Sequence, residues 1–167
     1  MKSLKAVAVS GPQLISAVAS LADQIWREHY VPIIGIKHVE YMLDKFQSPK
    51  AVAAQIEREG FIYFLLDPGG SWAGYFAVIP KGRELFLSKF YIKKEARRQG
   101  LGRQAFAFIE KIGRKNGASK TALVVNKRNS SIAAYERLGF VITDAVITDV
   151  GDGFVMDDYR MEKEITG

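Results

Sequence analysis

The chain of 167 residues contains no cysteine and only two histidines. Without cysteine it cannot use a thiol nucleophile, a thiolate metal site or a disulfide. The histidines, His29 and His38, lack the spacing of a metal-ligand pair, so we expect no metal. The absence of cysteine is also typical of a protein from a reducing compartment.

The sequence also lacks a long hydrophobic run. No apolar stretch approaches the ~20 residues of a membrane helix, and Lys2 and Lys5 interrupt an N-terminus too short to resemble a secretory signal. Hydrophobic residues still make up 48% of the chain, enough for one core without a metal or disulfide. We therefore predict a single domain over residues 1–167, in the cytoplasm, with no membrane partner.

The net charge is +6, and the densest basic run lies between residues 93 and 103. Such a patch binds phosphate groups of any origin, including those of nucleic acids. Single-strand binding sites interleave several aromatic residues with basic ones, however, and Tyr91 alone is near this run. No recognition-helix motif is visible either. We therefore predict no nucleic-acid partner and keep nucleic-acid binding as the least favoured function.

Within this run, Arg97-Arg98-Gln99-Gly100-Leu101-Gly102 lies between a predicted strand, Glu84 to Ile92, and a predicted amphipathic helix. Glycine at 100 and 102 lets a ligand approach the main chain. The N-terminus of the helix presents unpaired N–H groups and a positive dipole end. Residues 97–102, called the glycine loop below, therefore predict a pyrophosphate-binding site.

Three kinds of phosphate-binding loop compete for this position. A nucleoside-triphosphate loop requires Gly-Lys-Ser/Thr, and Gly102 is followed by Arg103-Gln104, which excludes it. The spacing of small residues matches a dinucleotide fingerprint, because Ala105 stands where the third small residue belongs. That fingerprint also expects a tight turn after the strand and repeated βαβ units, whereas a mostly charged segment separates Ile92 from Gly100.

The third kind rests on a family resemblance. Arg97-x-x-Gly100-x-Gly102, between a strand ending in Tyr91-Ile92 and an amphipathic helix, resembles the acetyl-coenzyme A motif of the GCN5-related N-acetyltransferases (GNAT). A second element, Asn126-Lys127-Arg128-Asn129 followed by Tyr135 and Leu138-Gly139-Phe140, is similar to the family's second motif. Two motifs in the family's order are more specific than either alone.

The predicted elements also follow the family's order. We expect strands at 5–9, 61–67, 71–80, 84–92, 121–125, 140–150 and 154–163, and helices from 12, around 39–46, from 49 to about 59, from 101, and at 131–138. The predicted class is therefore α/β (α+β), with the acyl-CoA N-acyltransferase (GNAT) fold. The resemblance implies a mixed, mostly antiparallel sheet of about seven strands, flanked by helices, with a splayed strand pair at the cofactor site.

Acetyl-coenzyme A is the cofactor that the resemblance implies. The residues implied in binding it are Phe90, Tyr91, Ile92, Arg97, Arg98, Gln99, Gly100, Leu101, Gly102, Arg103, Asn126 and Asn129. An unpaired backbone N–H at 90–92 would stabilise the developing oxyanion, so the main chain matters more there than the side chains. The two asparagines have local alternatives, an Asx turn and a helix cap.

Tyr135 resembles the family's catalytic tyrosine, which would protonate the departing thiolate. A phenol with a pKa near ~10 can protonate a thiol whose pKa is near ~8.5. The alternative role of Tyr135 is packing with Ile132 and Leu138 on the inner face of its helix. The sequence leaves both roles open.

The acceptor site is implied to lie on the first two helices and the final hairpin. Its candidate residues are Glu28, His29 and Tyr30, with Trp26, Ile33, Ile34 and Asp152 as further candidates. The predicted function is an N-acetyltransferase that uses acetyl-coenzyme A and acetylates a primary amine, of a small molecule such as a polyamine or of a protein, by direct attack in a ternary complex. The alternative is an acyl-coenzyme A sensor without turnover. We expect the amine as partner, with a homodimer as one option for assembly.

Overall fold

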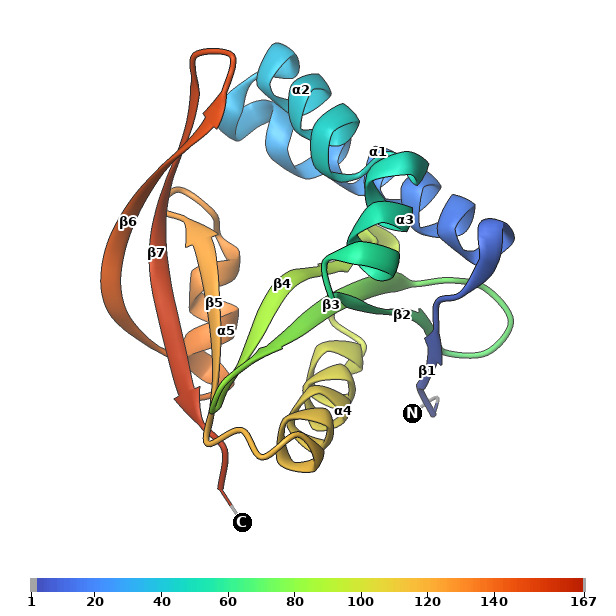
Figure 1. The fold of residues 1–167 in the computed structure, drawn as a ribbon, viewed down its shortest axis with the longest axis vertical. Helices are drawn as coiled ribbons and strands as arrows, with labels where there is room; N and C mark the ends of the chain where they lie inside the picture. The colour runs from blue at the N-terminus through green and yellow to red at the C-terminus, as the bar shows by residue number, and fades with distance from the viewer. Residues whose placement is uncertain (1–2, 167) are drawn as a thin grey trace. The chain divides into compact units, whose positions relative to one another are not determined.

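The computed structural model describes residues 3–166, and Figure 1 labels its elements. In chain order they are β1 (Lys5–Ala8), α1 (Gly11–Ile34), α2 (Ile36–Phe46), α3 (Pro49–Arg58), β2 (Ile62–Asp67), β3 (Gly74–Lys81), β4 (Glu84–Ile92), the short 3-10 helix η1 (Lys94–Ala96), α4 (Leu101–Lys115), β5 (Lys120–Asn126), α5 (Ser131–Arg137), β6 (Val141–Gly151) and β7 (Phe154–Glu164). The strands hydrogen-bond in the order β1-β2-β3-β4-β5-β7-β6. The predicted mixed, mostly antiparallel sheet is confirmed.

By its internal contacts the described chain forms two compact units. The first runs to Ile79 and takes in Lys89–Ile109. The second comprises Pro80–Ser88 and continues from Glu110. That the whole chain is one domain stays a prediction.

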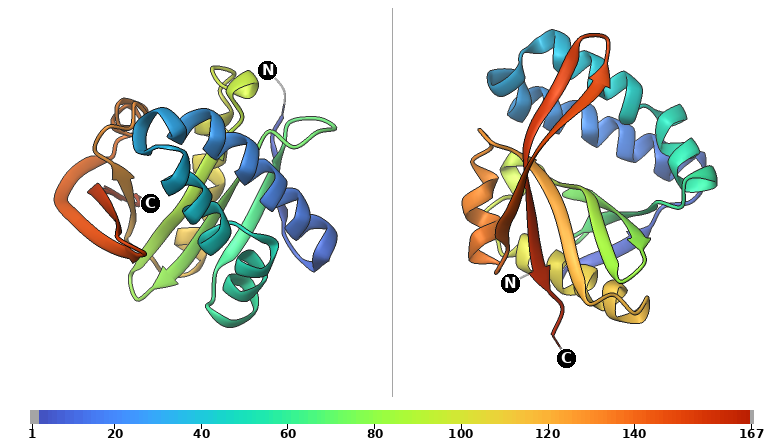
Figure 2. Two further views of the ribbon diagram at one scale, coloured as in Figure 1. Left: turned by 90° about the horizontal axis from the view of Figure 1, so that it is seen from above. Right: turned by 60° about the vertical axis from the view of Figure 1, so that its left-hand side comes forward.

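The first unit holds the helices α1, α2 and α3, which pack on one another (Figure 2). Helix α1, predicted from residue 12, buries Val18, Leu21 and Ile25, which recur at helical spacing on one face. Helix α3 begins at the predicted residue 49, and Ser48 caps it, because the Ser48 hydroxyl accepts a hydrogen bond from the Ala51 N–H at 3.1 Å. Strands β1, β2 and β3 pair antiparallel beside these helices.

Strand β3 begins later than the sequence predicted, at Gly74 instead of 71. The Asp67 carboxylate accepts hydrogen bonds from the Gly69 and Gly70 N–H groups, at 2.8 and 2.7 Å. These bonds build a turn that continues to Ala73, whose N–H donates to Leu66 O at 2.8 Å. The side chain of Asp67 therefore extends the turn into residues whose own composition suits a strand.

In the second unit β4 pairs with β5 in parallel, and β5, β7 and β6 pair antiparallel. The β4–β5 ladder joins Glu84–Phe86 to Lys120–Ala122, although both strands continue. It is thus the short ladder expected of a splayed pair, within the described residues. The β6–β7 hairpin turns at Asp152, whose φ of 53° lies between two glycines, as the sequence predicted. No helix in residues 3–166 is long and apolar enough to cross a membrane.

Candidate functional site

The carboxyl end of β4 is held by aromatic contacts in the first unit. The Tyr91 ring lies 5.5 Å from that of Tyr75, 5.8 Å from Trp26 and 6.2 Å from Tyr30, measured between ring centroids. Trp26 and Tyr30, both on α1, are buried, and their ring centroids lie 4.3 Å apart with the planes tilted by 32°. The structure therefore brings together a predicted cofactor residue, Tyr91, and a predicted acceptor residue, Tyr30.

The main chain at this strand end is approached closely by β3. A Cβ atom added at Gly74 would collide with the carbonyl oxygen of Tyr91 and meet the Cα of Ile92 at 3.0 Å. Next to it, the Lys93 N–H donates to Ala73 O at 2.8 Å. Sequence analysis missed Gly74, because a glycine inside a strand gives no sign of which backbone lies against it.

Phe90 contacts the helix that follows the glycine loop. Its ring packs against Phe106 of α4, with centroids 4.8 Å apart. Leu101, the first residue of α4, is buried, with 3% of the residue exposed. Its contact with the cofactor stays a prediction.

The glycine loop has the backbone conformation of an anion site. Arg98 has a φ of 61° and Gly100 a φ of 76°, both in the left-handed region that occurs in anion-binding backbone concavities. Helix α4 begins at Leu101, and its first N–H groups have no partner within the helix. A Cβ added at Gly102 would have no atom within 4 Å, so the space beside it is open. The loop therefore fits the pyrophosphate of coenzyme A.

The charge of the loop fits this ligand as well. Arg97, Arg98 and Arg103 are exposed, and none of them forms an ion pair within the described residues. The Nε of Arg97 donates to Ile92 O at 3.0 Å, which ties the loop to the end of β4. Guanidinium groups without carboxylate partners are available to phosphate.

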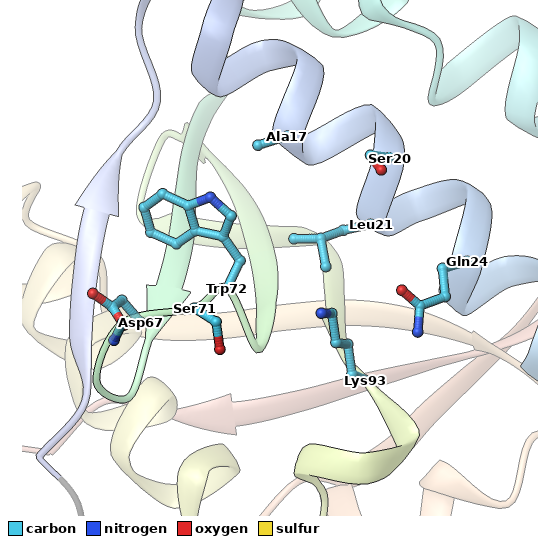
Figure 3. Close-up of a pocket in the computed structure, with 9 residues that line it drawn as sticks. Ala17, Ser20, Leu21, Gln24, Asp67, Ser71, Trp72 and Lys93 are labelled. Atoms are coloured by element: carbon cyan, nitrogen blue, oxygen red, sulfur yellow. The ribbon is translucent and has the colours of Figure 1, made fainter.

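A hollow of about 570 Å³ lies beside this strand end (Figure 3). Its lining residues are Ala17, Ser20, Leu21, Gln24, Asp67, Gly70, Ser71, Trp72 and Lys93. Lys93, from the end of β4, and Leu21, from α1, point toward one another in the close-up. Asp67 is already used by the turn, and its two backbone hydrogen bonds lower the pKa of its carboxyl.

The two candidate asparagines lie in the second unit and have local partners. The side-chain oxygen of Asn126, at the end of β5, accepts from the Arg128 N–H at 2.9 Å. The side-chain oxygen of Asn129 accepts from the Ser131 N–H at 2.8 Å, at the start of α5. The Asx turn of Asn126 is present, whereas the N-cap residue of α5 is Ser130, which makes no side-chain cap hydrogen bond. Any cofactor contact of the two asparagines stays a prediction.

Tyr135 lies on α5 of the second unit and is half-buried. Its ring packs edge-on against Phe140, with centroids 6.0 Å apart, and its carbonyl accepts from the Phe140 N–H at 3.0 Å. A packing role therefore exists, with Phe140 as a partner in addition to those the sequence suggested. The catalytic role stays a prediction.

The remaining acceptor candidates differ in environment. Glu28 is exposed on α1, and its helix continues to Ile34. His29 is half-buried, with its ring 4.8 Å from that of Tyr30. The aromatic cluster of the first unit thus includes His29 and Tyr30, whereas Glu28 faces solvent. Among residues 3–166 there is no group of three side chains that could hold a metal ion.

Comparison with known protein families identifies the family of this chain. A family model described as an acetyltransferase (GNAT) domain matches residues 30–163. The chain belongs to the GNAT acetyltransferase family. GNAT domains use acetyl-coenzyme A, so the predicted family and cofactor are confirmed. The match also makes this GNAT domain an acyltransferase, whose site residues stay predictions.

Solved structures show the same fold. The PaiA N-acetyltransferase from Thermoplasma acidophilum, in complex with coenzyme A, matches 97% of this chain and 99% of its own, with 20% identity and a TM-score of 0.81. The ribosomal-protein-S18-alanine N-acetyltransferase from Escherichia coli covers 100% and 96%, with 21% identity and a TM-score of 0.70. A nourseothricin acetyltransferase covers 64% and 66%, with 25% identity and a TM-score of 0.58. No curated protein sequence matches this chain.

Proposed function

We propose that this GNAT domain transfers an acetyl group from acetyl-coenzyme A to a primary amine, of a small molecule such as a polyamine or of a protein, by direct attack in a ternary complex. The observation that carries the proposal is the glycine loop, with its positive φ angles and with Arg97, Arg98 and the neighbouring Arg103, which form no ion pair with any residue in 3–166. The absence of cysteine supports direct attack, because it removes a thiol that could carry the acyl group.

Three parts of the chain and the cofactor have separate roles in this proposal. N–H groups of the glycine loop and the start of α4, with Arg97, Arg98 and Arg103, bind the pyrophosphate. The main chain at 90–92 binds the pantetheine arm, and a backbone N–H there stabilises the developing oxyanion. The bound cofactor supplies the thioester.

Tyr135 donates a proton to the departing thiolate. This role rests on the second motif, in which the stretch from Asn129 to Tyr135 is one residue shorter than is usual in the family. No carboxylate lies on β4 near Phe90, so we propose that water carries the proton away from the attacking amine.

We also propose that the domain assembles as a homodimer through β6, the strand at one edge of the sheet. Its apolar side chains are unusually exposed: Val141 by 60%, Ile142 by 45% and Ile147 by 71%. An exposed, apolar edge strand pairs readily with another strand, and a second copy offers an identical one.

Isothermal titration with acetyl-coenzyme A tests the cofactor site. Micromolar affinity is expected, weaker for dephospho-coenzyme A and abolished in the double variant Gly100→Trp, Gly102→Trp, whose indoles would fill the open side of the loop. Lys50→Met, at an exposed position on α3, is the control and should bind normally. No binding by the folded wild type would overturn the proposal.

Turnover separates an enzyme from a sensor. Thiol release is expected when acetyl-coenzyme A is mixed with a panel of primary amines that includes polyamines and peptides. Tight binding without thiol release from any of them would favour the sensor.

A further inference from the structure

Lys89 is a lysine in the core of the first unit. It lies on β4 at an inward position, after Leu85 and Leu87, and its exposure is 7%. Lysine is almost never this deeply buried unless its ammonium has partners. A lysine in the inward register of a buried strand was the sequence signal for this site, and sequence analysis passed over it.

Three acceptors surround the ammonium. Lys89 Nζ donates to Phe46 O at 2.7 Å, to Gln55 Oε1 at 3.0 Å and to the Tyr63 hydroxyl. An ammonium has three donors, so all of them are used. Phe46 ends α2, Gln55 lies on α3 and Tyr63 on β2, so one side chain joins three elements to β4.

The acceptors are themselves connected. Gln55 Nε2 donates to Phe46 O at 3.0 Å, and the Tyr63 hydroxyl donates to Gln55 Oε1. The carbonyl of Phe46 is one of those that a helix end leaves without an intrahelical partner, and the helix dipole makes this end negative. Lys89 Nζ also lies 5.1 Å from the centre of the Tyr63 ring.

No carboxylate from residues 3–166 contacts this ammonium. Among the charged and titratable groups around it, Glu59 at the end of α3 acts from a distance and raises its pKa, while Tyr63 and Tyr75 are neutral phenols whose pKa burial raises. Loss of solvent is the larger effect and lowers the pKa of Lys89 to about 7. The positive charge of Lys89 is therefore stabilised by hydrogen bonds to uncharged acceptors, and these require the acceptors to keep their positions.

A second contact links the same corner to the strands. Gln47, which follows α2, accepts a hydrogen bond from the Tyr75 hydroxyl at 2.9 Å. Tyr75 is the ring on which Tyr91 packs. The corner between α2 and α3 is thus joined to β4 directly, through Lys89, and to Tyr91 indirectly, through Tyr75.

We propose that Lys89 is a positioning residue, which holds the α2–α3 corner against β4 and thereby fixes the main chain at 90–92 for acetyl-coenzyme A. The inference rests on the proposed cofactor role of that main chain. Lys89 touches neither the cofactor nor the acceptor in this role. It acts through the strand that carries both Tyr91 and the entry to the glycine loop.

The test compares Lys89→Met, Lys89→Arg and Tyr63→Phe with the control Lys50→Met. We expect Lys89→Met to weaken acetyl-coenzyme A binding by about tenfold, since it removes a set of buried hydrogen bonds. Amide exchange at 90–92 should be faster in Lys89→Met than in the wild type. Tyr63→Phe keeps the ammonium and removes one acceptor, so its effect should be smaller, and Lys89→Arg should restore part of the affinity.

Amide exchange keeps this inference separate from the proposed function. A wild type that fails to bind acetyl-coenzyme A would overturn the function, whereas unchanged exchange at 90–92 in a folded Lys89→Met or Tyr63→Phe would overturn the holding role of Lys89. Faster amide exchange at 90–92 in Lys89→Met, with unchanged affinity for acetyl-coenzyme A, would overturn the link between the position of this main chain and cofactor binding. A general loss of stability, without a local effect at 90–92, would also contradict the proposal.

Discussion

Gly74 on β3 lies directly against the carbonyl oxygen of Tyr91 on β4. No side chain larger than hydrogen fits between these two main chains. The contact fixes the position of the strand end at which the pantetheine arm is proposed to bind. A methyl group added at Gly74 should therefore affect both the stability of the protein and its binding of the cofactor.

Gly74→Ala is expected to destabilise the protein by about 1–3 kcal/mol, because the added Cβ meets backbone that can only shift as a whole. Acetyl-coenzyme A affinity should fall with it. Gly113→Ala is the control, since its Cβ would meet the flexible end of Ile165 at 2.6 Å. Urea denaturation and titration measure both effects, and equal cofactor affinities in the two variants would contradict the role of the strand end.

Tyr135→Phe removes the proposed proton donor and keeps the ring that packs on Phe140. We expect kcat to fall by about 100-fold, the lower range for general acid catalysis, with acetyl-coenzyme A affinity unchanged. Steady-state rates and titration check the two parts. If kcat stays within twofold of the wild type, Tyr135 has only its packing role.

Lys89 should make stability depend on pH. Its pKa is about 7 in the folded chain and near 10.5 when unfolded, so between these values the unfolded chain binds more protons. The free energy of unfolding therefore rises with pH, by up to about 1.4 kcal/mol per unit. Lys89→Met lacks this titration.

The difference in unfolding free energy between wild type and Lys89→Met should consequently shift by roughly 2 kcal/mol in favour of the wild type from pH 7 to pH 9. Denaturation at a series of pH values measures it. The range stops at pH 9 because unfolded tyrosines titrate above it, and burial raises the pKa of Tyr63. Parallel pH profiles for the two proteins would show that Lys89 titrates as an exposed lysine does.

The proposed β6 interface can be tested with single cysteines, because the chain has none of its own. In an antiparallel pair related by a two-fold axis, only a residue near the axis faces its own copy. We expect one of Ala145→Cys, Val146→Cys or Ile147→Cys to form a disulfide-linked dimer under mild oxidation, while Thr143→Cys does not. Light scattering that shows a monomer at high concentration would rule the interface out.

Local signals made much of the fold predictable. Strand β4 has the predicted bounds, and α3 begins at the predicted residue 49, because alternation and capping act within a few residues. The glycine loop was predictable for the same reason. The contact of Gly74 with Tyr91 and the acceptors of Lys89 were not, since each joins segments far apart in the chain.

The attachment of the α2–α3 corner has a consequence for the evolution of substrate range. Substitutions of Gln47 or Gln55, which make this attachment, are expected to disturb the strand proposed to bind the cofactor, so these positions are constrained by chemistry common to all acceptors. The other end of α2 is free of that constraint: it begins at exposed Ile36, after Gly35 with its φ of 87°. Because the acceptor site is proposed to lie on the first two helices, we expect new acceptor specificities to arise by remodelling the α1–α2 junction while the acetyl donor site is inherited unchanged.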